Sequence, residues 1–391
     1  MPTSMHSAAA AASTASAAAS DADPRYRHAS QSFAWRAGDF ASSVAFSLKF
    51  GAADRAEFHA AIARWNAGGR TQPVTELTRA DYALSPALTA RLEAAAREVR
   101  DGHGFVVLKG LPTEGLDIEQ YGMAVWGIGL HFGSALSQNA QGERLTHVVD
   151  ATGDDPTPRM YRSNLELRPH TDITAMIALA SWNRSQSGGA SVVTSAVTVH
   201  DEIRRRAPHL LAPLYRGYHY HRLGEEGPGE APVTERRVPV FANRNGQISC
   251  RYLRSGIVGG QNALGQPVGE EDRAAMDLFD AIAADPANRL AFFLERGEMI
   301  VINNYTVMHA RTRFVNYPEP ERRRQLVRLW LDDAGFRDVP PEFNFFRTNG
   351  VPKQAGRRAS YDFKKLYAND PLATGGVPDL RISDDEAART R

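Results

Sequence analysis

The first residues that could carry chemistry are His170-Thr171-Asp172, where an imidazole and a carboxylate stand two positions apart. If the segment from Leu165 to Ala180 is extended, side chains at i and i+2 project from the same face, so both groups can bind one metal ion. With 12 histidines and 45 acidic residues, however, chance alone gives about 1.4 His-x-acid triplets in this chain. The triplet therefore needs support from other residues.

A second triplet, His200-Asp201-Glu202, provides a contrast. It falls in the segment from Val199 to Arg206, whose pattern predicts a helix, and positions i and i+2 of a helix point about 200° apart. We interpret this second triplet as structural.

His309 is the best candidate for a third ligand. It follows a predicted buried strand from Met299 to Ile302 and the turn Asn303-Asn304. A single histidine is more often a hydrogen-bonded core or surface residue than a metal ligand, so the case for His309 depends on its surroundings.

The surroundings include two arginines on one predicted strand. Arg324, Leu326, Arg328 and Trp330 alternate, so that their side chains share one face. Two guanidinium groups on a face rich in apolar residues need anionic partners, because an unpaired buried charge is costly. Two histidines and one carboxylate form the facial triad of non-haem Fe(II) oxygenases, which leaves three positions for a bidentate 2-oxo acid and dioxygen. A guanidinium fork would bind the far carboxylate of that acid.

The elements that must position these residues are short strands with a few helices. A Ser-Pro start, an apolar stripe and Gly102 predict a helix after Ser85, and acidic first-turn residues predict another from Glu270 to Ile282. A third helix is expected from Asp117 to Trp126. Predicted strands are Phe105 to Leu108, Val192-Val193, Val238 to Phe241, Ile248 to Leu253, Met299 to Ile302 and Leu326 to Leu331. The pattern is typical of a mainly β sandwich or barrel with helices packed outside.

Composition excludes several classes of protein. The chain has 391 residues, of which 42% are apolar and 23% charged, with a net charge of +1, so a nucleic-acid partner is not expected. Its one cysteine, Cys250, excludes an internal disulfide framework and fits a reducing, cytoplasmic location. The absence of a long apolar run predicts no membrane span. The Ala/Ser-rich residues 1–24 are expected to form a disordered tail.

Taken together, four blocks of the sequence resemble the taurine dioxygenase-like branch of the Fe(II)/2-oxoglutarate-dependent dioxygenases, which includes clavaminate synthase-like and γ-butyrobetaine hydroxylase-like enzymes. Their order and spacing match as a set. The resemblance implies a double-stranded β-helix, the cupin-like jelly roll, at about 101–335 within a single domain of residues 25–391. The blocks are Gly104 to Gly110, Pro169 to Asp172, Gly188 to Ser191, and Asn304 to Arg313 with Arg324 to Asp332.

The resemblance also implies roles for individual residues. His170, Asp172 and His309 would be the Fe(II) ligands, Arg324 would bind the distal carboxylate of 2-oxoglutarate, and Ser191 would assist it. Arg328 would bind an anionic group of the substrate. Two departures from the family pattern are Asn303-Asn304, where many relatives have Asp-Asn, and the longer segment from Phe314 to Arg323.

The implied reaction converts 2-oxoglutarate and dioxygen to succinate and CO2 while oxidising, most simply hydroxylating, a second substrate. Asp172 argues against a halogenase, because halogenases of this superfamily have a small residue there. We expect a small, anionic or amino-acid-like substrate, because Arg328 is the charged anchor the sequence offers. Other side chains expected to face this substrate are Gln138, Asn139, Asn164, Ile173 and Trp182.

Two alternatives stay open at the level of sequence. A zinc hydrolase bound through histidine and aspartate would need a water-activating base and gives no role to Arg324 and Arg328. A non-catalytic jelly-roll binding protein would have no reason to keep the triad together with both arginines.

Overall fold

The computed structural model describes residues 23–27, 32–67, 72–152 and 162–354. Its larger β-sheet has the strand order β1-β2-β12-β6-β15-β3, and β4 also pairs with β15. Every pairing is antiparallel except that of β1 with β2. The strands are β1 (Ser47–Lys49), β2 (Phe105–Lys109), β3 (Ser134–Ala135), β4 (Leu145–Val149), β6 (Met176–Asn183), β12 (Glu298–Asn303) and β15 (Gln325–Asp332).

A smaller antiparallel sheet has the order β11-β8-β13-β5. Apolar side chains of both sheets, such as Ile177 and Ile300 from the larger and Val193 and Leu290 from the smaller, belong to one buried cluster. The two sheets therefore face each other as the expected jelly roll. The strands are β5 (Leu167–His170), β8 (Ser191–Ser195), β11 (Arg289–Phe292) and β13 (Val307–Arg311).

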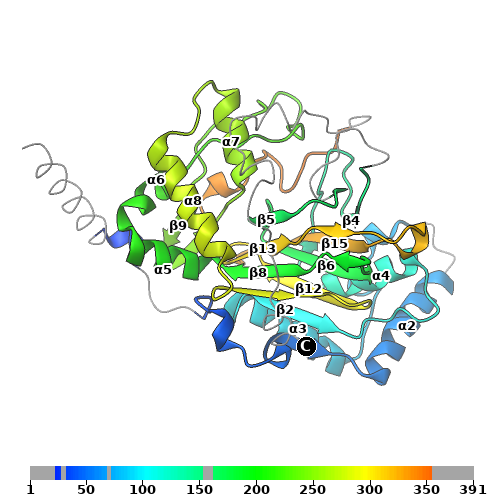
Figure 1. The fold of residues 1–391 in the computed structure, drawn as a ribbon. Coiled ribbons are helices and arrows are strands. Elements are labelled where there is room, and N and C mark those ends of the chain that lie inside the picture. The colour runs from blue at the N-terminus through cyan, green and yellow to red at the C-terminus, as the bar shows by residue number, and fades with distance from the viewer. Residues whose placement is uncertain (1–22, 28–31, 68–71, 153–161, 355–391) are drawn as a thin grey trace, which may run out of the picture.

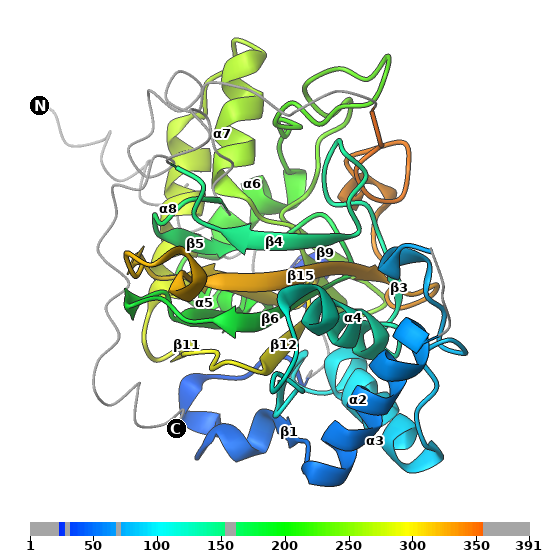
Figure 2. The same cartoon turned by 90° about the vertical axis from the view of Figure 1, so that its right-hand side faces the viewer.

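Helices cover the outer faces of both sheets (Figures 1 and 2). The larger sheet packs against α2 (Ala52–Ala67), α3 (Pro86–Asp101) and α4 (Ile118–Gly129) through a second apolar cluster. The smaller sheet is covered by residues inserted between β8 and β11, which include α5 (Ala196–Arg206), α6 (Leu211–Arg216), α7 (Arg254–Ala263) and α8 (Glu270–Ala284). The same insertion contains the hairpin of β9 (Phe241–Arg244) and β10 (Gln247–Cys250).

The predicted helices are confirmed. The Ser85 hydroxyl accepts a hydrogen bond from the Leu88 N–H, so Ser85 caps α3, and Pro86 begins the helix. Asp117 caps α4 through a capping box with Gln120, and α4 ends at Gly129 rather than Trp126. Glu270, the first residue of α8, places a negative charge at the positive end of the helix dipole.

Two predicted strands are displaced. Val238 makes only an isolated bridge to Tyr218, and regular pairing starts at Phe241 because Pro239 has no N–H to donate. The second strand, predicted from Ile248 to Leu253, ends at Cys250. Two residues further on, the carbonyl oxygen of Tyr252 accepts the N–H of Thr171, in the segment between β5 and β6.

An extended conformation was expected from Leu165 to Ala180, but the segment is extended only in part. It contains β5 of the smaller sheet, a crossing at residues 171–175, and β6 of the larger sheet. Of the predicted tail, residues 1–22 lie outside the described part of the chain. None of the described helices is long and apolar enough to cross a membrane.

Candidate metal centre

The two histidines meet because their strands pair. His309 of β13 is the direct cross-strand partner of His170 at the end of β5, and their ring centroids lie 4.3 Å apart. Asp172 follows in the crossing to β6, with its Oδ1 3.7 Å from Nε2 of His170. One potential ligand atom from each residue lies within 4.8 Å of the others, and no other such cluster occurs among the described residues. The crossing therefore brings Asp172 back to the histidines without the regular strand assumed from sequence.

The two imidazoles have different surroundings. Nδ1 of His170 donates to the carbonyl oxygen of Arg168 at 2.7 Å, so Nε2 is the nitrogen available to a metal ion. Burial, assisted by the neighbouring His170 and Arg328, lowers the pKa of His309 to about 3, although Asp172 opposes this shift. The buried Nδ1 of His309 has no hydrogen-bond partner in the described structure. A buried ring nitrogen without a hydrogen-bond partner is consistent with a histidine that coordinates a metal ion.

The carboxylate of Asp172 divides its two oxygens between different partners. Oδ1 faces His170, whereas Oδ2 accepts a 2.8 Å hydrogen bond from Nε1 of Trp330 and lies 3.6 Å from Nη1 of Arg328. Burial alone would raise the pKa of Asp172, but Arg328, both histidines and the Trp330 hydrogen bond outweigh it and lower the pKa to about 2. The group is therefore ionised at neutral pH. Two imidazoles and one carboxylate are the donor set that suits a divalent transition metal such as Fe(II).

Arg328 is held in place from the other side. Its Nε donates to Oε1 of Gln138 at 2.7 Å, and the amide of Gln138 donates to the carbonyl oxygens of Arg144 and Arg328. The Thr146 hydroxyl also donates to Oε1 of Gln138. Gln138 therefore fixes the guanidinium of Arg328 beside the three candidate metal ligands. The structure thus brings Gln138 and Arg328, both predicted site residues, together.

Arg324 immediately precedes β15 and lies four residues before Arg328. Four residues of extended chain correspond to roughly 13 Å. Arg324 is 5% exposed, and its buried Nη1 has no hydrogen-bond partner among the described residues. Burial lowers its pKa to about 10, so it remains charged at neutral pH. Ser191 and Arg324 line one small cavity, as expected for two groups that bind the same anion.

Sequence reasoning missed a second arginine at this end of the jelly roll. Arg311 pairs with Ser191 across the sheet and lies two residues from His309, so it shares the inner face. Arg311 and Arg324 lie over the ring of Phe314, at 4.8 and 5.0 Å from its centroid. Nη2 of Arg311 also donates to the carbonyl oxygens of Ser163 and Leu165. Its i+2 spacing from His309 could have revealed it.

The remaining predicted substrate residues have different surroundings. The carbonyl oxygen of Asn164 accepts the N–H of Phe314, whereas the side chain of Asn139 bonds within its own turn, to the N–H groups of Gln141 and Glu143. Ile173 lines a cavity on the other side of the crossing.

Trp182 does not face the metal cluster, which corrects the prediction. The residues of β6 that pair with Arg328 and Trp330 are Leu179 and Ile177, so Trp182 projects from the opposite face. There it contacts Tyr121 of α4 and stacks with Arg296. The second triplet is structural, as interpreted: His200 is buried in α5 with Nε2 3.0 Å from the hydroxyl of Tyr215.

Comparison with known proteins agrees with this geometry. The sequence model of the protein family described as taurine catabolism dioxygenase TauD, TfdA family matches residues 70–330 of this chain. FR-33289 synthase of Streptomyces rubellomurinus is 32% identical over 300 residues, covering 75% of this chain and 87% of the relative. The taurine hydroxylase-like protein SAT17 of Stachybotrys chartarum is 22% identical over 356 residues, covering 87% and 88%.

Solved structures share the fold. An asparagine oxygenase in complex with Fe(II), 2S,3S-3-hydroxyasparagine and succinate superposes with a TM-score of 0.59 at 17% identity, covering 77% of this chain and 98% of the other. The non-haem iron oxygenase OrfP, in complex with iron and α-ketoglutaric acid, gives a TM-score of 0.53 at 13% identity, covering 73% and 94%.

Proposed function

The chain belongs to the taurine catabolism dioxygenase (TauD, TfdA) family, and from this premise we propose that it hydroxylates a small anionic, amino-acid-like substrate. It is an Fe(II)/2-oxoglutarate-dependent oxygenase, which forms succinate and CO2 from its co-substrate. Family membership decides against the zinc hydrolase and the non-catalytic binding protein that the sequence had left open.

We assign the metal to His170, Asp172 and His309. The supporting observation is the one ligand cluster of the described residues, in which His309 is neutral and the carboxylate of Asp172 is ionised. When bound there, Fe(II) would supply the activation of dioxygen. The chain's own contribution is to keep three protein ligands on one side and to hold Oδ2 of Asp172 on Trp330 and Arg328.

We assign the distal carboxylate of 2-oxoglutarate to Arg324 and Ser191. A buried guanidinium nitrogen without a partner is a site prepared for an anion, because the uncompensated charge is otherwise costly. Ser191 pairs with Arg311, two residues along from His309, which corresponds to roughly 7 Å. A five-carbon dicarboxylate can span this interval with one end at the metal.

We assign the substrate's anionic group to Arg328, which Gln138 orients. Asn164, beside Phe314 and between two carbonyl partners of Arg311, lies toward the co-substrate end. Arg328 is the cation beside the metal cluster in the described structure, so a carboxylate bound to it would place the adjoining carbon atoms near the metal. Two structural neighbours are recorded with hydroxylated amino acids, 3-hydroxyasparagine and (3S)-hydroxy-L-Arg. These neighbours motivate the substrate class.

The test is a substrate screen with purified protein, Fe(II) and 2-oxoglutarate, in which succinate formation is measured for amino acids, N-acyl amino acids, sulfonates and phosphonates. We expect at least one anionic compound to stimulate succinate formation and to gain one oxygen atom by mass spectrometry. Stimulation confined to compounds that carry no carboxylate or comparable anionic group would overturn the substrate assignment. Protein loaded with Fe(II) that forms no succinate under any condition would overturn the reaction.

A further inference from the structure

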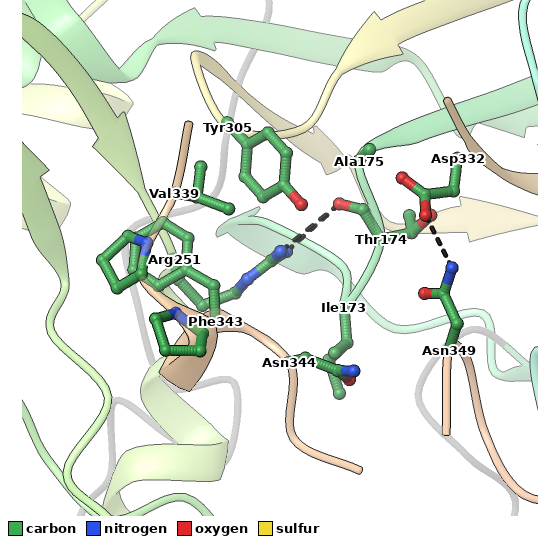
Figure 3. A pocket seen from close by; sticks show the side chains of 12 residues that line it. Ile173, Thr174, Ala175, Arg251, Tyr305, Asp332, Val339, Phe343, Asn344 and Asn349 are labelled. Atoms are coloured by element: carbon green, nitrogen blue, oxygen red, sulfur yellow. Dashed lines mark hydrogen bonds between the residues drawn. The ribbon is translucent and has the colours of Figure 1, made fainter. Parts of the chain in front are cut away.

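Arg251 is a fully buried cation outside the jelly-roll strands. It follows β10 in the insertion between β8 and β11 and is 2% exposed. Figure 3 shows its guanidinium between Tyr305 and Phe343, directed at the chain around Thr174. The two ring centroids lie 5.0 and 5.4 Å from its central carbon. No carboxylate of the described residues forms an ion pair with it, so rings and backbone carbonyls compensate its charge.

Those carbonyls belong to the metal-site crossing. Nη1 of Arg251 donates to the carbonyl oxygen of Asp172, and both Nη atoms lie 3.4 Å from the carbonyl oxygen of Thr174. Asn304 reaches the same two oxygens through Nδ2, at 2.5 and 3.2 Å, and accepts the Asp172 N–H through Oδ1. The carbonyl groups of Asp172 and Thr174 are therefore each bound by two side chains from different elements.

The neighbouring residue extends this clamp. The carbonyl oxygen of Tyr252 accepts the Thr171 N–H at 2.8 Å, and the Tyr252 N–H donates to the Thr171 hydroxyl at 2.9 Å. Residues 171–175 connect two sheets and have no ladder of their own. The backbone around Asp172 is therefore held by bonds from Arg251, Asn304 and Tyr252.

We propose that Arg251 is a positioning residue that orients Asp172 for metal binding through the backbone of the His170-to-Thr174 crossing. The inference rests on the proposed iron site. Arg251 does not touch the metal ligands' side chains, so its effect is on affinity and geometry, not on the reacting atoms. Loss of a group that orients a metal-ligating side chain typically lowers metal affinity or activity by ten- to a hundred-fold.

The test compares Arg251→Met and Arg251→Lys in the full chain, with Co(II) as a spectroscopic probe for the metal site. We expect Arg251→Met to weaken Co(II) binding about ten- to a hundred-fold and to change the visible spectrum of the bound ion. Arg251→Lys should recover part of the affinity, because it keeps the charge but cannot hold both carbonyl groups through a planar fork.

Arg222→Met is the matched control. Arg222 is also a buried arginine that binds backbone carbonyl groups, those of Phe345, Ala231 and Val233, but none at the metal site. It should lose thermal stability without losing Co(II) affinity. If Arg251→Met does not fold, the Arg251→Lys titration alone decides.

Wild-type Co(II) affinity in every folded Arg251 variant, or an equal loss in Arg222→Met, would overturn the role of Arg251. These outcomes are distinct from failure of the proposed function. Native protein that binds Co(II) but makes no succinate with Fe(II) would contradict the reaction and leave the comparison of affinities valid.

Discussion

At the scale of single residues, His309 is the ligand whose environment most restricts what it can do. Its pKa of about 3 keeps it neutral, and its buried Nδ1 has no protein partner among the described residues. An unsatisfied buried polar atom costs about 1–3 kcal/mol, so the fold retains a group that metal binding can use.

We therefore expect His309→Ala to lose Fe(II) binding and succinate formation while the core stays folded. Equilibrium dialysis with Fe(II), a succinate assay and circular dichroism measure the three properties. His209→Ala is the control, because His209 is exposed and remote from the cluster. A His309→Ala protein that formed succinate at the normal rate would remove His309 from the metal site.

Arg324, just before β15, and Arg328, within it, have separable roles. Arg324→Ala should raise the 2-oxoglutarate requirement about ten- to a hundred-fold, as expected for the loss of a charge-assisted pair of about 1.5–3 kcal/mol. Arg324→Lys should restore this only in part, because lysine lacks the two-pronged geometry. The measurement is the apparent KM for 2-oxoglutarate in uncoupled turnover.

Arg328→Ala should leave uncoupled 2-oxoglutarate turnover nearly intact and weaken stimulation by the primary substrate. Trp330 still binds Oδ2 of Asp172 in this variant, so the carboxylate keeps a hydrogen bond. If Arg328→Ala raised the 2-oxoglutarate requirement more than Arg324→Ala does, the two assignments should be exchanged.

At the scale of elements, the turn between β7 (Ser187–Gly188) and β8 supports the Arg324 side chain. Gly189 has a φ of +75°, and a Cβ there would lie 3.2 Å from Nε of Arg324 and 2.8 Å from the Ser185 hydroxyl. Gly115 has a similar φ of +69° but has nothing within 4 Å of the added atom. Substitution of either glycine would strain the backbone, but only substitution of Gly189 would also crowd a neighbouring side chain.

We expect Gly189→Ala and Gly115→Ala to share a loss of stability of about 1–2 kcal/mol from the left-handed backbone. Only Gly189→Ala should also raise the 2-oxoglutarate requirement, because it displaces Arg324. Thermal melts and the same KM assay distinguish the effects. Equal KM values in both variants would mean that Arg324 does not depend on this turn.

The elements also show how far sequence reasoning extends. Alternation along β15 correctly placed Arg328 and Trp330 on one face, because a regular strand fixes which side chains share a face. Arg324 precedes this strand, whose ladder with β6 is irregular between Gln325 and Leu326. Trp182 was assigned to the wrong face because pairing register, which no single segment contains, decides the side of a strand. Arg251 was missed for a similar reason: its partners are backbone carbonyl groups about 80 residues away in the chain, at Asp172 and Thr174.

At the scale of the whole molecule, the site unites segments from across the sequence. β5 and β13 supply the two histidines, the crossing between β5 and β6 supplies Asp172, and β15 with the residue before it supplies Arg328 and Arg324. Gln138 precedes β4, and the insertion supplies Arg251. None of these segments can form the site alone, since the three ligands come from separate segments and Asp172 is oriented by Trp330 and Arg328, which are distant in the chain. Binding of metal and co-substrate should consequently stabilise the entire fold and not a local motif.

We expect a divalent metal at a hundred times its dissociation constant to stabilise the protein by about 2.7 kcal/mol, which raises the melting temperature by a few degrees. Mn(II) under nitrogen is a suitable probe, and a chelator should reverse the shift. A further rise with 2-oxoglutarate should be smaller in Arg324→Ala at the same 2-oxoglutarate concentration, whereas His309→Ala should lose the metal-dependent rise itself. Because both ligands stabilise the same folded state, the melting temperatures of the two variants distinguish the metal site from the 2-oxoglutarate site without a turnover assay. A full metal-dependent shift in His309→Ala would place the binding of that metal elsewhere in the protein.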